Sequence, residues 1–255
     1  MRFQDKVAII TGGADGIARA TARIMAREGG YVVAADVNAA GLATLDDELK
    51  AAGNKLLTVE TDVLDPQQVQ RLVDTAVDTC GRVDILVNAV GGSTVIPNSR
   101  AYLDELSLEE WERVLNFNLR GTFLCTSAVL KQMKKQGAGG KIVNISSLAG
   151  HGISATSSSA YSAAKAGIMA LTRKVAREAG PHGITCNAIA PGATASSRTS
   201  LNAGMSEQQR RELVDPVPLG RIAQPEDQAK VIAFLASEDA DYVTGVIIDV
   251  NGGRY

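Results

Sequence analysis

The stretch Val7-Ala8-Ile9-Ile10-Thr11-Gly12-Gly13-Ala14-Asp15-Gly16-Ile17-Ala18 decides the fold of this chain. It begins with a short apolar run that is typical of a buried β-strand, and apolar residues at helical spacing follow over residues 17–28. A second strand-like run covers residues 31–35. A strand, a helix and a strand in this order predict a βαβ unit, in which the two strands lie parallel.

The same alternation continues along the rest of the chain. Helical spacing is found over residues 39–52, 66–80, 111–135, 160–179 and 225–236, and strand-like runs over 56–60, 83–87, 141–145, 184–189 and 246–249. These runs are continuously apolar, as expected for strands that helices cover on both faces. The sequence therefore predicts an α/β fold, a single domain over residues 1–255 with a Rossmann-type doubly wound parallel sheet of about seven strands flanked by helices.

Composition narrows the class of protein. The chain is 45% hydrophobic with a mean hydropathy of +0.02, which is typical of a globular protein in water. Its net charge of −2 is spread over interspersed acids and bases, so no positive field favours nucleic acid. The first residues lack the apolar stretch of a signal peptide, and no run approaches the roughly 20 apolar residues of a membrane span. We expect a cytoplasmic protein without nucleic-acid or membrane partners.

Metal chemistry is not expected. Cys80, Cys125 and Cys186 lie far apart and form no C-x-x-C pair, so we interpret them as small buried hydrophobic residues. His151 and His182 lack a second histidine at the spacing of a metal site.

The turn after the first strand is typical of a phosphate-binding loop. Small residues around Gly12 and Gly16 let the backbone turn tightly, and the N–H groups of the following helix face the anion. The spacing is not G-x-G-x-x-G, because Gly12 and Gly16 are four apart and Ala18 follows Ile17, and no Walker A lysine is present. Dinucleotide binding is the functional interpretation, and a glycine-rich turn without a ligand is the alternative.

Asp36 ends the second strand, 20 residues after Gly16. A carboxylate there can accept hydrogen bonds from both hydroxyls of an adenosine ribose, and it would repel a 2′-phosphate. Its neighbours Val37 and Asn38 offer no cation to receive NADP. We therefore expect NAD as the cofactor, while a simple helix cap is the alternative role for Asp36.

Tyr161 and Lys165 lie four residues apart at the start of a predicted helix, and hence on one face. Hydride transfer belongs to a nicotinamide, so the protein must supply an acid or a base. A phenol has an ordinary pKa of about 10, and a nearby ammonium favours the phenolate. The segment 144–147 ends a strand at the edge where open α/β sheets bind ligands. A serine there either hydrogen-bonds the reacting oxygen or caps a turn.

These motifs, in their order, resemble the short-chain dehydrogenase/reductase family over essentially the whole chain. The shared motifs are Thr11-Gly12-x-x-x-Gly16-Ile17, Asp62-Val63, Asn88-Ala89, Asn118, Ser147, Tyr161-x-x-x-Lys165 and Pro191-Gly192. By this resemblance Tyr161 is the catalytic acid/base, and Lys165 lowers its pKa and holds the nicotinamide ribose. Ser147 would orient the substrate oxygen, and Asn118 would support a water-linked proton relay.

The resemblance also assigns the cofactor site. It places Asp62 and Val63 at the adenine, Asn88 beside the adenosine ribose and the central strands, and Thr194 near the carboxamide. The full set of expected cofactor-binding residues is Gly12, Asp15, Gly16, Ile17, Asp36, Asp62, Val63, Asn88, Tyr161, Lys165 and Thr194.

The sequence departs from the family pattern at four places. Ala18 replaces the usual third glycine of the phosphate loop, and residues 89–92 (Ala-Val-Gly-Gly) replace the common continuation after Asn88. Ser196 stands where threonine is usual, and the gap from Ser147 to Tyr161 is one residue longer than the commonest spacing. The longer gap puts the assignment of the serine in question, but not that of the tyrosine.

Residues 193–221 are polar, irregular and longer than an ordinary connection, which is typical of an active-site lid. Residues 206–213 within it have helical spacing. Arg198 and Arg100 are candidates for contact with an anionic substrate group.

We therefore expect an NAD(H)-dependent oxidoreductase that interconverts a secondary alcohol, for example a cyclic alcohol, diol, sugar or steroid, and a ketone. A 3-oxoacyl thioester reductase is the alternative within the family. A non-catalytic dinucleotide sensor would have lost Tyr161 or Lys165, and a hydrolase would need a Gly-x-Ser-x-Gly elbow, which this sequence lacks. The resemblance also implies a homotetramer packed through residues 111–135 and 160–179.

Overall fold

Seven parallel strands form one sheet in the order β3-β2-β1-β4-β5-β6-β7. The computed structural model describes residues 1–154, 157–195 and 206–254. The strands are β1 (Val7–Thr11), β2 (Tyr31–Asp36), β3 (Leu56–Glu60), β4 (Ile85–Asn88), β5 (Gly140–Ile145), β6 (Ile184–Pro191) and β7 (Ile247–Val250). This is the Rossmann-type sheet that the sequence predicts.

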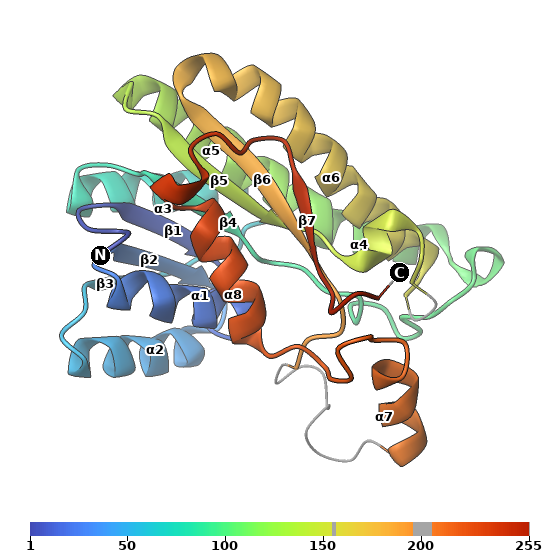
Figure 1. Cartoon of the computed structure of the whole chain (residues 1–255). Helices are drawn as coiled ribbons and strands as arrows, with labels where there is room; N and C mark the ends of the chain where they lie inside the picture. The colour runs from blue at the N-terminus through green and yellow to red at the C-terminus, as the bar shows by residue number, and fades with distance from the viewer. Residues whose placement is uncertain (155–156, 196–205, 255) are drawn as a thin grey trace.

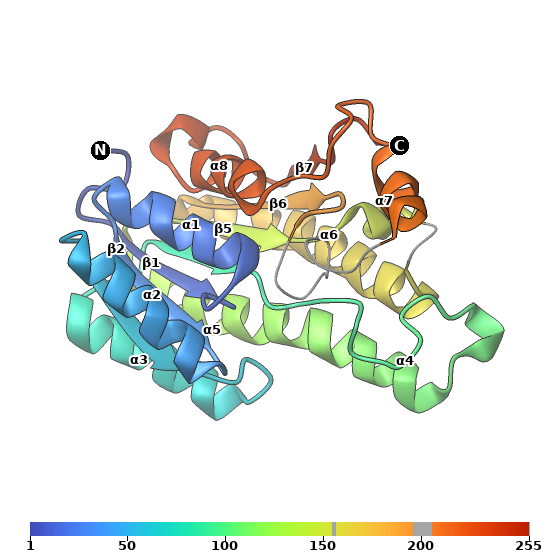
Figure 2. The same cartoon turned by 90° about the horizontal axis from the view of Figure 1, so that it is seen from below.

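Helices cover both faces of the sheet (Figures 1 and 2). On one face lie α1 (Gly16–Arg27), α2 (Ala39–Ala51) and α8 (Pro225–Leu235), and on the other α3 (Pro66–Cys80), α5 (Gly121–Gln136) and α6 (Ser159–Ala179). Alternate strand residues point to opposite faces, so Ala8 and Ile10 pack in the first core and Val7 and Ile9 in the second. Burial on both faces explains why the strands are continuously apolar.

Local signals in the sequence set the helix ends. Asp65 caps α3 by accepting hydrogen bonds from the N–H groups of Gln67 at 2.8 Å and Gln68 at 3.3 Å, and Pro66 takes the first helical position. The helix ends at Gly81, which adopts a left-handed conformation with φ of 79°. Asn38 caps α2 in the same way, accepting from the N–H of Gly41 at 3.0 Å.

The helix expected over residues 111–135 is interrupted. It consists of α4 (Leu108–Leu115), a π-helical turn (Asn116–Arg120) and α5. Ser107 and Glu110 form a capping box that starts α4 three residues earlier than expected. The π-turn inserts an extra residue into the helical repeat, and such turns are frequent at functional sites.

The irregular region between β6 and α8 contains α7 (Glu207–Val214), close to the helical run expected over residues 206–213. Short 3-10 turns precede α4 (η1, Leu103–Glu105), follow β5 (η3, Leu148–His151), follow α6 (η4, Gly180–His182) and precede β7 (η5, Glu238–Ala240).

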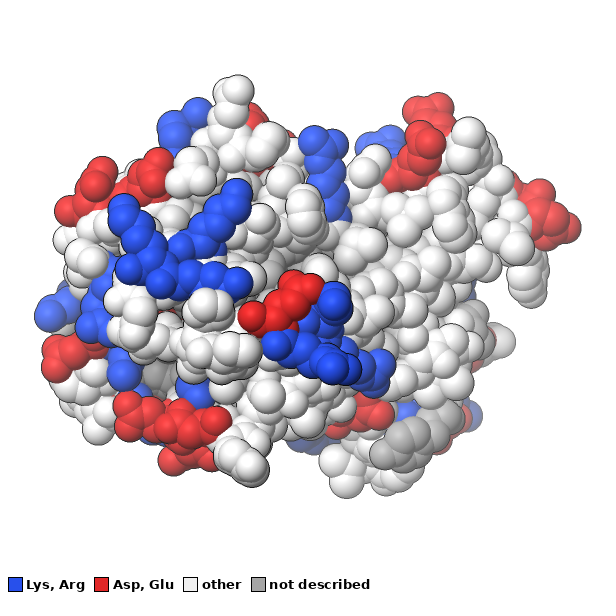
Figure 3. Space-filling model, turned by 90° about the horizontal axis from the view of Figure 1, so that it is seen from above, with Lys and Arg blue, Asp and Glu red and all other residues white. Residues whose placement is uncertain are grey.

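The surface carries both signs of charge. Figure 3 shows basic and acidic side chains in separate clusters on one face, with a broad area free of both to the right of the centre. Within the described residues, no helix combines the length and the apolar character that crossing a membrane requires.

Candidate active site

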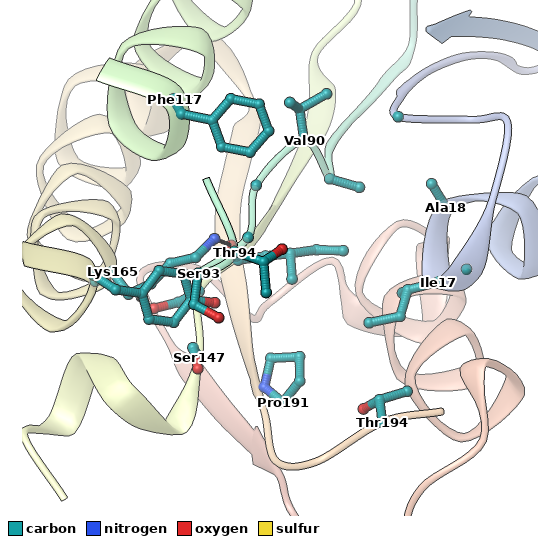
Figure 4. Close-up of a pocket in the computed structure, with 18 of the residues that line it drawn as sticks. Ile17, Ala18, Val90, Ser93, Thr94, Phe117, Ser147, Lys165, Pro191 and Thr194 are labelled. Atoms are coloured by element: carbon teal, nitrogen blue, oxygen red, sulfur yellow. Dashed lines mark hydrogen bonds between the residues drawn. The ribbon is translucent and has the colours of Figure 1, made fainter. Parts of the chain in front are cut away.

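A cavity of about 470 Å³ lies at the carboxyl ends of the strands. The sheet order reverses between β1 and β4, so the connections leaving these neighbouring strands run to opposite faces and leave a crevice between them. Eleven of the expected site residues line the cavity: Gly12, Asp15, Gly16, Ile17, Asp36, Asp62, Val63, Ser147, Tyr161, Lys165 and Thr194. Figure 4 shows its two ends, with Ile17 and Ala18 on one side and Ser147 and Lys165 on the other.

The phosphate loop has the backbone that an anion cradle requires. Gly12 and Gly16 have φ of 72° and 56°, in the left-handed region that favours glycine. A Cβ on Gly12 would make only an ordinary contact of 3.4 Å with the backbone carbonyl of Ala89, so the left-handed backbone, and not lack of space, favours glycine at this position. The first turn of α1 faces the cavity through Gly16, Ile17 and Ala18, and its N–H groups have no partners within the helix. Ala18, which stands in place of the usual third glycine, is buried, and the loop still lines the cavity.

Asp36 is a buried carboxylate on the cavity wall. Its Oδ2 accepts a hydrogen bond from the N–H of Ala14 at 3.1 Å, and its Oδ1 accepts from the N–H of Asn38 at 3.0 Å. Each oxygen can accept a further hydrogen bond, so the fixed carboxylate still has capacity for a ribose diol. The cap of α2 is Asn38, and the alternative in which Asp36 caps that helix is therefore wrong.

Asp62 and Val63 follow β3 on the same wall. The Oδ1 of Asp62 accepts a hydrogen bond from the N–H of Leu64 at 2.9 Å, which fixes the turn. Val63 is buried against Gly121, where an added Cβ would lie 2.8 Å from the valine methyl. The pair forms a floor with one polar and one apolar group.

Tyr161, Ser147 and Lys165 come together at the other end of the cavity. Ser158 caps α6 and thereby places Tyr161 in the first turn of this helix. The Ser147 side chain lies close enough to the Tyr161 phenol to lower its pKa, and the Ser147 Oγ accepts a hydrogen bond from the N–H of Ala149 at 3.2 Å. The Lys165 ammonium donates to the carbonyl of Ile145 at 3.0 Å and lies 5.6 Å from the centre of the Tyr161 ring.

The neighbouring Ser146 has a different environment from Ser147. It is buried and donates a hydrogen bond to the carbonyl of Lys165 at 2.8 Å, which ties the end of β5 to α6. The structure therefore brings Ser147 to the tyrosine, in spite of the longer spacing between the two residues.

Burial dominates the titration of this pair. Removal from water raises the pKa of the Tyr161 phenol, and the nearby Ser147 side chain lowers it in part. Burial also lowers the pKa of Lys165 to about 8. Burial is the largest influence on the Tyr161 phenol, and the lowering of its pKa by Lys165, whose Nζ lies 5.6 Å from the ring centre, stays a prediction.

Asn118 lies in the π-turn behind the cavity wall and does not line the cavity itself. Its Nδ2 donates to the carbonyls of Gly92 at 3.0 Å and Val114 at 2.9 Å, and its Oδ1 accepts from the N–H of Gly92 at 2.9 Å. A Cβ on Gly91 would lie 2.8 Å from both this Oδ1 and the Nζ of Lys165. Asn118 therefore fixes the segment after β4 next to Lys165.

Asn88 and Thr194 are held in different ways. Asn88 lies in the core, where its Nδ2 donates to Thr126 at 2.9 Å and to Asn144 at 2.8 Å, and its side chain does not reach the cavity wall expected for it. Thr194 lines the cavity, and its Oγ1 donates to the carbonyl of Gly192 and accepts from Gln228, both at 3.2 Å.

Several wall residues were not singled out from the sequence. Apolar residues that line the cavity include Val95, Phe117, Leu148, Ala149 and Leu213, and Val95 belongs to the same apolar cluster as Tyr161. An arginine, Arg254, follows β7 and also lines the cavity. Ligands of open α/β sheets bind at the carboxyl ends of the strands, and Arg254 follows the last strand, so the sequence does contain a signal for this residue. Arg100 is exposed and does not line the cavity, while Ser196 and Arg198 lie outside the described residues.

The cysteines take no part in the cavity. Cys125 and Cys186 are buried, as expected, and burial raises the pKa of each thiol to about 12. Cys80 is only partly buried. Among the described residues, no group of three His, Cys, Asp or Glu side chains is arranged to hold a metal ion.

The cavity combines a cradle for phosphates, a carboxylate for a ribose and a phenol that can exchange a proton. The residues at the first end fit a dinucleotide, since the glycine backbone, the helix N–H groups and Asp36 supply the donors and acceptors that it requires. The second end supplies an acid/base next to apolar walls.

Comparisons with known proteins cover nearly the whole chain. A family model described as enoyl-(acyl carrier protein) reductase matches residues 12–254. The chain is 42% identical over 251 residues to cis-4-hydroxycyclohexanecarboxylate dehydrogenase of Sinomonas cyclohexanicum, covering 98% of this chain and 97% of the relative. It is 37% identical over 254 residues to 3-oxoacyl-(acyl-carrier-protein) reductase of Thermotoga maritima, with 99% of each chain covered. The crystal structure of a short-chain type dehydrogenase/reductase from Mycobacterium marinum superposes with a TM-score of 0.90 at 31% identity, covering 99% of this chain and 96% of that chain.

Proposed function

Because this chain belongs to the short-chain dehydrogenase/reductase family, and is thus an oxidoreductase acting on CH–OH or ketone groups, we propose that it oxidises a secondary alcohol with NAD. The observation that carries the proposal is the cluster of Tyr161, Ser147 and Lys165 at one end of a cavity whose other end holds Asp36. The cluster of Tyr161, Ser147 and Lys165 supports proton transfer to and from an alcohol oxygen, and Asp36 supports the choice of NAD over NADP.

The residues divide the work at the reacting carbon. The nicotinamide, when bound, accepts or returns a hydride. Tyr161 takes the proton from the alcohol oxygen during oxidation and returns it to the carbonyl oxygen during reduction. Ser147, whose side chain lies near the phenol, donates a hydrogen bond to the substrate oxygen, so that this oxygen lies beside Tyr161. Lys165, fixed by the carbonyl of Ile145, stabilises the phenolate and holds the nicotinamide ribose.

Different residues at the other end of the cavity would bind different parts of the cofactor. Gly12, Gly16 and Ile17 would hold the pyrophosphate through backbone N–H groups, and Asp36 would accept hydrogen bonds from the adenosine ribose. Asp62 and Val63 would contact the adenine, and Thr194 would contact the carboxamide. Asp15 would contact the cofactor from within the phosphate loop.

The walls near Tyr161 favour a substrate with a hydrocarbon body. Val95, Phe117 and Leu148 line that end of the cavity, and an apolar wall excludes water from the reacting oxygen. A cyclic secondary alcohol suits these walls, and one relative is named for such a substrate. Reduction of a 3-oxoacyl thioester is the second candidate, which the name of another relative supports.

A panel of substrates tests the function. Secondary alcohols, including cyclic alcohols, diols and sugars, are incubated with NAD or NADP and followed by the absorbance of the reduced nicotinamide, and 3-oxoacyl thioesters are tested with NADH and NADPH. We expect oxidation of an alcohol with NAD, and a fall in kcat/KM of roughly 100-fold or more in Tyr161→Phe. Full activity in that variant would refute the mechanism, and preferential use of NADP would overturn the role of Asp36.

We also infer a homotetramer, built through the outer faces of α4, α5 and α6. Leu108 and Phe123 on these helices are 72% and 54% exposed, which is unusual for large apolar side chains. An area without charged side chains is visible in Figure 3 on the side where α4 and α6 lie in Figure 1.

A further inference from the structure

The segment that follows β7 forms a fixed turn next to the cavity. Asn251 is buried, its Nδ2 donates to the carbonyl of Arg254 at 2.7 Å, and its Oδ1 accepts from the N–H of Gly253 at 2.9 Å. Gly252 and Gly253 have φ of 68° and 87°, so the turn needs both glycines. The backbone of Arg254 is therefore held in place, and this residue lines the cavity.

The sheet order places Arg254 at the substrate end of the cavity. The strands β2 and β3, which carry Asp36 and lead to Asp62, lie at one side of the sheet, and β7 is the strand at the opposite edge. Figures 1 and 2 both show the C-terminus on the side of the molecule where α6 begins. From the sheet order we infer that Arg254 lies at the end of the cavity that Tyr161 lines, rather than at the end near Asp36.

The guanidinium of Arg254 forms no ion pair with another described residue. The other charged residues that line the cavity are the carboxylates Asp15, Asp36 and Asp62, and Lys165, which already donates to the carbonyl of Ile145. Within the described part of the chain, no carboxylate lies within ion-pair distance of Arg254. The acidic residue closest to it in sequence, Asp249, instead pairs with His151 at 2.8 Å.

We propose that Arg254 binds a carboxylate of the substrate, and that the substrates are therefore hydroxycarboxylates whose acid group is remote from the reacting hydroxyl. The inference rests on the proposed function, because it assumes that a secondary alcohol reacts at Tyr161. A guanidinium presents a planar fork that binds both oxygens of a carboxylate, and the partly buried position of Arg254 strengthens such a pair.

A matched pair of substrates tests the role of Arg254. The pair is a hydroxycycloalkane carboxylate and its methyl ester, which differ in charge at the group that Arg254 would contact. We expect Arg254→Met to lower kcat/KM for the carboxylate roughly 10- to 100-fold, mainly through KM, and to change that for the ester less than about threefold. Arg254→Lys should restore part of the loss, and Arg71→Met, an exposed arginine on α3, should change neither value. Equal losses on both substrates would overturn the proposal.

Binding without turnover separates this inference from the proposed function. A cycloalkane carboxylate that lacks the hydroxyl is titrated into the enzyme with NAD and followed by calorimetry. Binding to the wild type that Arg254→Met weakens at least about tenfold supports the carboxylate site even if the alcohol panel fails. Absent binding, or equal binding by the two proteins, overturns the role of Arg254 and leaves the proposed reaction untouched.

Discussion

At the scale of single residues, the active tyrosine and lysine are both shifted toward their neutral forms. Burial raises the pKa of Tyr161 and lowers that of Lys165 to about 8, so the protein favours a phenol next to a weakly basic amine. A phenol can protonate a ketone at neutral pH, whereas oxidation of an alcohol needs the phenolate. The two directions of the reaction therefore depend on pH in opposite ways.

The first prediction concerns this pH dependence. The phenolate fraction rises tenfold per pH unit below the pKa of Tyr161, so kcat/KM for alcohol oxidation should rise roughly tenfold per unit from about pH 6 to the pH of about 8 where Lys165 titrates. Ketone reduction should not rise over this range. Initial rates at low substrate concentration in both directions check the slopes, and a flat profile for oxidation would show that Tyr161 is not the base.

The second prediction concerns stability and Lys165. The unfolded lysine titrates near 10.5 and the folded one near 8, so between these values the unfolded chain binds more protons, and the free energy of unfolding rises with pH. Lys165→Met lacks this contribution. From pH 7 to 10.5 the wild type should gain up to about 3 kcal/mol relative to the variant.

Urea unfolding of both apoproteins over this pH range measures the difference. The raised pKa values of the Cys125 and Cys186 thiols act in the opposite direction above pH 9, but they are common to both proteins and cancel in the comparison. A difference that does not change with pH would mean that Lys165 is not desolvated in the folded protein.

At the scale of elements, periodicity predicts the strands and most helices but not the π-turn. The apolar runs give all seven strands to within about two residues, because each strand is buried on both faces. The apolar spacing over residues 111–135 predicts one continuous helix, because a single inserted residue hardly changes this spacing. Asn118 of the π-turn is hydrogen-bonded to Gly92, 26 residues away, and local sequence gives no sign of this contact.

The third prediction tests that contact through Gly91. In Gly91→Ala the new Cβ would lie 2.8 Å from both the Oδ1 of Asn118 and the Nζ of Lys165, so both groups, or the backbone of residue 91, must move. We expect kcat/KM to fall at least about tenfold, because small displacements of reacting groups are costly, and stability to fall by roughly 1–3 kcal/mol.

Gly180→Ala is the matched control. Gly180 has helical dihedral angles, and no atom lies within 4 Å of the Cβ that the change would add. We expect unchanged kinetics and a gain in stability of about 0.4–1 kcal/mol. If Gly91→Ala behaved like this control in activity and thermal unfolding, the segment after β4 would not position Lys165.

At the scale of the whole molecule, the site is divided across the sheet. Motifs near β1, β2 and β3 form the phosphate and ribose end, and their short spacing makes them readable from the sequence. The rest of the cavity is lined by segments far apart in the chain, including Phe117, Leu148, Leu213 and Arg254. The spacing of these residues in the sequence does not show that they line one cavity. Their proximity depends on the order of the strands in the sheet and on the connections between the strands.

The last prediction concerns assembly. The 26.7 kDa chain should have a mass about four times larger by light scattering, because exposed apolar side chains on α4 and α5 need a partner surface in water. Phe123→Glu should give smaller species with an unchanged circular dichroism spectrum, since a side chain that is 54% exposed contributes little to the fold of the monomer, and Arg71→Met should keep the full mass. A wild-type mass of about 27 kDa would exclude the tetramer, and a Phe123→Glu protein of full mass would exclude this face as its interface.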